Sequence, residues 1–87
     1  MPEISRFYGI KIRMHFGHRE HPPAHFHARY QHHSVFVALD GTVLHGSLPE
    51  RELKLVREWA AQHDAELSAN WERCNQNELP FKIAPLH

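Results

Sequence analysis

The sequence contains little cysteine and glycine and no long apolar run. Only one of its 87 residues is cysteine, Cys74, so no internal disulfide can form, which fits a reducing cytoplasm. No apolar run approaches the roughly 20 residues of a membrane span, and the start of the chain has no signal-like pattern. The four glycines form no phosphate-binding loop, and no serine or cysteine stands in a nucleophile motif. We therefore expect a cytoplasmic protein with no membrane segment.

The length and charge of the chain indicate one small, polarised domain over residues 1–87. A chain of this size buries only about 60–65% of its extended surface, so the core is thin and a second copy in a homodimer could complete it. Residues 1–33 hold five Lys/Arg against two acids, and residues 34–87 hold five against eight. This asymmetry favours an anion near the first part of the chain, although ordinary solvation explains it equally well.

Hydrophobic alternation predicts that residues 8–46 form an antiparallel sheet, preceded by a lead-in of residues 1–7. Apolar residues occupy every second position over 8–16 and again over 24–30, a pattern typical of half-buried strands. The segment 17–23 contains one glycine and two prolines, which interrupt a strand ladder, so it is expected to be the loop of this first hairpin.

A second hairpin is predicted after a turn at His32-His33. Residues 34–39 are more uniformly apolar, which places them near the centre of the sheet. Asp40-Gly41 predicts a tight turn, after which residues 42–46 return as a short strand. The expected sheet therefore has four strands in two hairpins.

The segment 47–76 is expected to be a long C-terminal helix. Ser47-Leu-Pro-Glu50 resembles a capping box, and apolar residues then recur at steps of three or four as far as Cys74. His63 lies in this apolar stripe as a core histidine, and a break near it is expected because Asp64 can cap a second segment. Residues 77–87 form an extended tail on the sheet edge or on a partner. The predicted fold class is α+β, with the helix packed on one face of the sheet.

The most informative stretch runs from His21 to Tyr30. On an extended strand its even-numbered residues, alanine, phenylalanine and tyrosine, face one side, whereas His25, His27 and Arg29 face the other. Alternate side chains lie about 6.6 Å apart along a strand, close enough to act on one phosphate or one metal ion.

In the first hairpin, the alternation of side chains places further basic residues on the same face. A hairpin that brings residue 16 near residue 24 forms three polar cross-strand pairs: His15 with His25, Arg13 with His27, and Lys11 with Arg29. Like charges placed opposite each other destabilise a sheet without a counter-ion, so this face is expected to bind an anion.

Three kinds of chemistry fit this face, and solvated histidines on a polar surface are the alternative to all of them. Imidazoles that titrate near pH ~6.5 can share acid and base roles, with arginine stabilising negative charge. A metal-independent, ribonuclease-like site would use His25 and His27 as the acid and base, with Arg13 and Arg29 as an anion clamp. The groups expected to bind phosphate are Lys11, His15 and His21.

The second chemistry is a divalent transition metal such as zinc, held by His21, His25 and His27. Paired cysteines are absent, and the main prediction includes no cofactor. The third is RNA binding without catalysis, with aromatic stacking from Phe7, Tyr8 or Tyr30, although the alternation is expected to bury both tyrosines.

Six segments of the chain match a known family pattern: residues 4–10, 21–30, 46–49, 55–60, 67–71 and 82–86. On these segments the chain resembles the domain of unknown function 4160 family of small prokaryotic proteins. The resemblance implies that the protein is the toxin half of a type II toxin–antitoxin module. The neighbouring gene would then encode the antitoxin, a protein of the domain of unknown function 2442 family. The resemblance also implies that the family's histidine motif falls on His25 and His27. A non-enzymatic binding module that acts through a partner protein is the alternative function.

Overall fold

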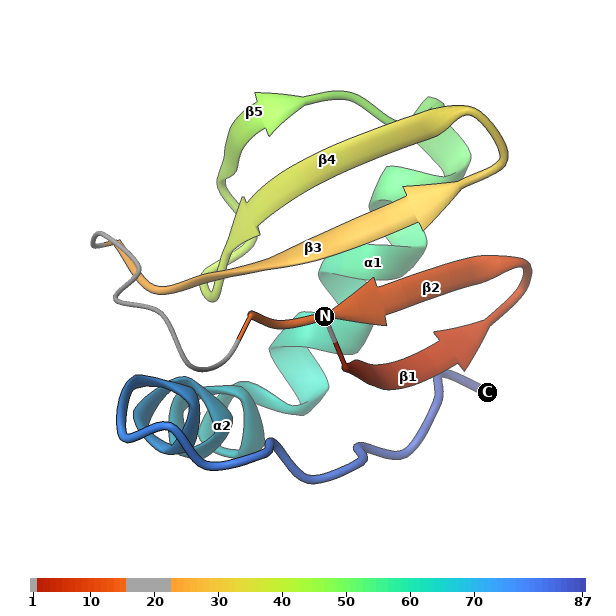
Figure 1. Cartoon of the computed structure of the whole chain (residues 1–87). Coiled ribbons are helices and arrows are strands. Elements are labelled where there is room, and N and C mark those ends of the chain that lie inside the picture. The colour runs from red at the N-terminus through yellow and green to blue at the C-terminus, as the bar shows by residue number, and fades with distance from the viewer. Residues whose placement is uncertain (1, 16–22) are drawn as a thin grey trace.

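The computed structural model describes residues 2–15 and 23–87, which form an α+β fold with an antiparallel sheet and two helices packed against it (Figure 1). Each strand pairs with the next along the chain, so the sheet order follows the sequence. Its five strands are β1 (Glu3–Phe7), β2 (Ile10–Arg13), β3 (His25–Tyr30), β4 (His33–Ala38) and β5 (Val43–Gly46). The helices are α1 (Glu50–Gln62) and α2 (Asp64–Asn75).

The first strand, β1, corrects the prediction that residues 1–7 are a lead-in. Phe7 pairs with Ile10, so Tyr8 and Gly9 form a two-residue turn in which both residues have positive φ, 50° and 80°. Such turns match the twist of a hairpin, and glycine adopts a positive φ without steric cost. The predicted strand over 8–16 is therefore wrong at its start. Tyr8 is 55% exposed and does not join the core as the alternation indicated.

The pairing of β2 with β3 has the register that parity predicted. Lys11 lies opposite Arg29, and Arg13 lies opposite His27. The third expected pair, His15 with His25, is absent from the described ladder because β2 ends at Arg13. The predicted loop over 17–23 falls almost wholly outside the described residues.

The second hairpin forms at the predicted turn. Gly41 adopts a φ of 96°, and the backbone amide of Thr42 donates a 2.9 Å hydrogen bond to the carboxylate of Asp40. This bond lowers the pKa of Asp40. The strand before the turn differs from expectation: Val35 and Val37 are buried, whereas Phe36 between them faces the opposite side and is exposed.

The predicted helix is two helices, interrupted at His63 as the sequence indicated. The imidazole Nδ1 of His63 lies 2.6 Å from a carboxylate oxygen of Glu66. The expected capping box is wrong: α1 begins at Glu50 after Pro49, without a side-chain capping bond. The backbone amide of Ser47 instead donates to the carbonyl of Ser34, so Ser47 extends the sheet. Neither helix in the described chain has the length and apolar character needed to cross a membrane.

Trp59 on α1 joins the sheet, the helices and the tail. Its ring lies 5.5 Å from that of Phe7 and 5.6 Å from that of Phe26, and the side chain is fully buried. Its indole N–H donates a 2.8 Å hydrogen bond to the carbonyl of Ala84. In Figure 1 α1 crosses behind the sheet, and the contact of Trp59 with Phe26 shows that the apolar side of the strands faces this helix. Among the described residues, α1 leaves the opposite side of the sheet uncovered.

The tail over 77–87 packs on α2 and on the edge of the sheet, one of the two places that the sequence allowed. The side-chain amide of Asn70, which is 1% exposed, donates to the carbonyl of Phe81 and accepts from its amide, both at 2.8 Å. Further along, the amide of Ile83 donates to the carbonyl of Ile4 in β1. The tail thus covers part of one sheet edge (Figure 1).

Replacing Asn70 with alanine is expected to lower the free energy of unfolding by about 1–3 kcal/mol, because it leaves backbone groups of Phe81 unsatisfied in a partly buried site. Urea denaturation followed by circular dichroism measures this change. The matched control is Asn75→Ala, an exposed position on the same helix that should change stability far less. Equal effects of the two variants would contradict the anchoring role of Asn70.

Candidate functional site

The open side of the sheet carries the residues that the sequence singled out, and we call it the histidine–arginine face. It comprises Lys11, Arg13 and His15 from β2 and its end, and His25, His27 and Arg29 from β3. Its orientation is fixed from the other side of the strands, where Ile12, Phe26 and Ala28 are buried. Because alternate residues face opposite sides, burial of these apolar neighbours places the basic groups together.

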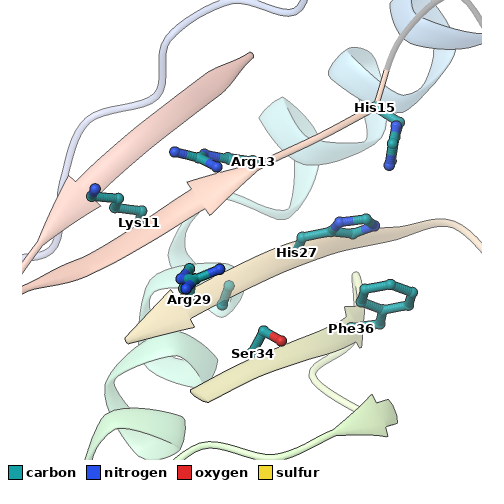
Figure 2. Close-up of a pocket in the computed structure, with 8 residues that line it drawn as sticks. Lys11, Arg13, His15, His27, Arg29, Ser34 and Phe36 are labelled. Carbon is teal, nitrogen blue, oxygen red and sulfur yellow. The ribbon is translucent and has the colours of Figure 1, made fainter. Parts of the chain in front are cut away.

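A cavity of about 260 Å³ lies on this face (Figure 2). This volume is slightly below the ~300–1,000 Å³ of typical small-molecule sites, so it suits a phosphate group with part of its carrier. Its lining residues come from three adjacent strands and are Lys11, Arg13, His15, His27, Ala28, Arg29, Ser34 and Phe36. Five of the seven residues predicted to bind or act on phosphate thus line one cavity.

The cavity is lined by three basic side chains that form no ion pair with a described acid. Lys11 and Arg29 lie directly opposite each other on neighbouring strands, and none of the ion pairs between described residues involves either of them or Arg13. The Nε atom of Arg13 is buried without a hydrogen-bond partner in the described part of the chain. Buried donors that lack an acceptor cost free energy, so an anion in the cavity would stabilise this arrangement.

The nearest acid on the same side of the sheet already has a partner. Glu3 on β1 lies 2.8 Å from the guanidinium of Arg6, and the hydrogen bond from Arg6 lowers the pKa of this carboxyl. Glu3 also lies opposite Arg13 in the ladder, and the positive charge of Arg13 contributes to the lowered pKa, so Glu3 offsets charge from both arginines. Lys11 and Arg29 form no ion pair with a described acid.

His27 lies at the centre of a cluster of rings. The imidazole of His15 meets it edge-on at 4.9 Å, and the ring of Phe36 stacks on it at 4.0 Å with an interplanar angle of 12°. His25 stacks more loosely, at 5.6 Å and also 12°. The two histidines predicted as an acid and base pair therefore lie side by side on the same face, as the strand parity indicated.

His25 differs from His27 in its position and its contacts. It does not line the cavity, and its ring lies 5.3 Å from that of Trp71 on α2. Its Nδ1 is 3.0 Å from the carbonyl oxygen of Pro23. A carbonyl oxygen can only accept a hydrogen bond, so this contact places a hydrogen on Nδ1 and leaves Nε2 as the ring nitrogen that can act as a base.

Sequence reasoning missed the aromatic part of the site. Phe36 was assigned to an apolar central strand, yet its Cα partner in β3 is His27, and Ser34 similarly lies opposite Arg29. His45, at 5.7 Å from Phe36, extends the cluster onto β5. The signal was present in the sequence: once β3 and β4 are paired, parity places Ser34 and Phe36 beside the basic residues.

The alternative metal site is only partly covered by the structure, because His21 lies outside the described residues. Among residues 2–15 and 23–87, no group of three or more histidine, cysteine or acidic residues is arranged to hold a metal ion. His25 and His27 by themselves provide two imidazoles, which is fewer than the three or four protein ligands of zinc sites.

The fold and the face define an α+β protein with an open, basic and histidine-rich sheet surface. The family model described as "Domain of unknown function (DUF4160)" matches residues 9–72, so the chain belongs to that family and the resemblance noted in the sequence is confirmed. No curated protein and no solved structure matches the chain.

Pyrophosphate is expected to stabilise the protein through this face. At ten times its Kd an anion that binds only the folded state contributes about 1.4 kcal/mol, which corresponds to roughly 5–10 °C in thermal midpoint for a domain of this size. The variant Lys11→Gln should show a smaller shift. Without the anion it should be more stable than the wild type by about 0.2–1 kcal/mol, because a like-charge pair is removed.

Differential scanning fluorimetry with and without pyrophosphate measures both effects. The control, Lys54→Gln, removes the same charge from an exposed position on α1. If Lys11→Gln and Lys54→Gln respond to pyrophosphate as the wild type does, the face is not the anion site.

Proposed function

We propose that this protein is the toxin half of a two-gene toxin–antitoxin module and that its histidine–arginine face binds RNA. The observation that carries the proposal is the convergence of Lys11, Arg13 and Arg29 on one cavity beside imidazoles, with no ion pair to a described acid. Basic side chains supply most of the affinity for a phosphate backbone. The resemblance to the family supplies the toxin assignment.

Cleavage of RNA at this face would need no metal ion. His25, whose Nε2 presents a lone pair, would take the proton of a 2′-hydroxyl, and the 2′-oxygen would then form a bond to the adjacent phosphorus. The bond from phosphorus to the 5′-oxygen breaks, and His27 in its protonated form gives that oxygen a proton. The products are a 2′,3′-cyclic phosphate and a 5′-hydroxyl. Arg13 and Arg29 would stabilise the charge on the transferring phosphate.

A non-enzymatic module that acts through a protein partner is the second candidate. It is favoured by the tail, where Leu79 and Phe81 are 58% and 63% exposed, the highest values among the large hydrophobic side chains of the described chain. Exposed apolar side chains that gather into one patch often mark a contact with another protein. In the toxin proposal the same tail, or the histidine–arginine face, would be covered by an antitoxin of the domain of unknown function 2442 type.

Induction of the wild-type protein alone is expected to stop cell growth, and His25→Ala/His27→Ala is expected to restore it. The loss of both imidazoles removes acid and base catalysis, which contributes about 10²–10⁴-fold to a rate. Colony counts after induction give the first readout. Cleavage of a labelled RNA by the purified protein, with the cyclic phosphate identified by mass spectrometry, gives the second.

The matched control is His32→Ala/His87→Ala, two exposed histidines in the β3–β4 turn and at the last residue. It should arrest growth as the wild type does. Equal toxicity of the folded His25→Ala/His27→Ala variant would remove the active-site assignment. A wild type that neither arrests growth nor cleaves RNA, but forms a tight complex with the neighbouring gene product, would support the binding module instead.

A further inference from the structure

Phe36 is an exposed aromatic ring on a face that is otherwise polar. The side chain is 36% exposed, while Val35 and Val37 on either side of it are fully buried. The core is therefore complete without Phe36. Its ring stacks on His27 at 4.0 Å and lies near His45, so it belongs to a ring cluster that opens to solvent at the cavity.

The cavity has two chemically different ends. Figure 2 shows Lys11, Arg13 and Arg29 gathered at one end, and the rings of His15, His27 and Phe36 at the other. Arg29 and Phe36 lie on neighbouring strands, because Arg29 pairs with Ser34 and Phe36 follows two residues later. Strand spacing and rise put their Cα atoms about 8 Å apart, a span that one nucleotide covers from its phosphate to its base.

We infer that the ligand is single-stranded RNA, held with a phosphate at the cationic end and an unpaired base stacked on Phe36. This inference rests on the proposed function and names its substrate class. A base presents its ring face to an aromatic side chain only when it is unpaired and unstacked from its neighbours. In a duplex the phosphates are available but the base faces are covered, so a duplex would engage the cationic end alone.

The hydroxyl of Ser34 adds a polar group between the two ends. Ser34 lines the cavity next to Arg29, its partner across the ladder, and lies on the same side of β4 as Phe36. A hydroxyl can both donate and accept, and so can the 2′-hydroxyl of a ribose. The order cation, hydroxyl, ring along the cavity matches the order phosphate, sugar, base along a nucleotide.

Three labelled probes of equal length separate the contributions of charge and base. They are a single-stranded 2′-O-methyl RNA, the same strand in a duplex, and an abasic strand with the same backbone. The 2′-O-methyl group prevents cleavage by the 2′-oxygen. By fluorescence anisotropy at one salt concentration, the wild type should bind the single strand about ten-fold more tightly than the abasic strand, as expected for one stacked base.

Variants at position 36 test the ring itself. Phe36→Leu should bind the base-bearing and abasic strands equally, with its affinity for the abasic strand unchanged. Phe36→Tyr keeps the ring and should retain the preference. Phe81→Leu, the same substitution at the exposed ring of the tail, is the matched control and should behave as the wild type. Circular dichroism of each variant shows that it is folded.

The outcomes distinguish this inference from the proposed function. If the wild type binds the single, duplex and abasic strands equally, base stacking is overturned while phosphate binding stands. If it binds none of them, both proposals fail. If polyglutamate of equal charge binds as tightly as the single strand, the face recognises acidic protein and the RNA assignment is overturned. The wild-type comparison decides these cases even if Phe36→Leu does not fold.

Discussion

The structure depends on burying one side of β2 and β3 against α1. Ile12, Phe26 and Ala28 are removed from water beneath Trp59, and this burial leaves a single orientation for every residue between them. A shift by one residue would expose these side chains and place guanidinium and imidazole groups in the core, at a cost of several kcal/mol. The grouping of basic side chains on the open side is thus a direct result of the packing behind it.

That grouping of basic side chains works against the stability of the protein alone. The opposed Lys11 and Arg29, and the buried Nε of Arg13, are unfavourable in the protein alone. A bound anion would offset the repulsion between the two opposed cations. Next to them the imidazole of His27 stacks on the ring of Phe36. Basic side chains and aromatic rings thus line the same cavity.

The sequence predicted the α+β class from two periods, alternation over the strands and steps of three or four over the helices. Alternation also placed His25 and His27 on a common face, and together with the position of the loop it predicted the register of β2 with β3. It failed where alternation and backbone geometry disagree. Tyr8 continues the apolar pattern but sits in a turn, so β1 was missed. Apolar composition placed residues 34–39 near the centre of the sheet, but composition does not report which side of the strand Phe36 faces. The sequence correctly indicated the break between the helices at His63. It wrongly indicated a capping box at Ser47, because the backbone amide of Ser47 bonds to the carbonyl of Ser34 and no side chain caps α1.

The attachment of the tail has a consequence for its surface chemistry. The side chain of Asn70 bonds to the backbone amide and carbonyl of Phe81, so these two hydrogen bonds do not involve the aromatic ring. Any amino acid except proline, which has no amide hydrogen, can make the same two bonds. The outward side chains of this segment can therefore diverge among homologous chains while the path of the segment is conserved, which would let one scaffold distinguish between different interacting proteins.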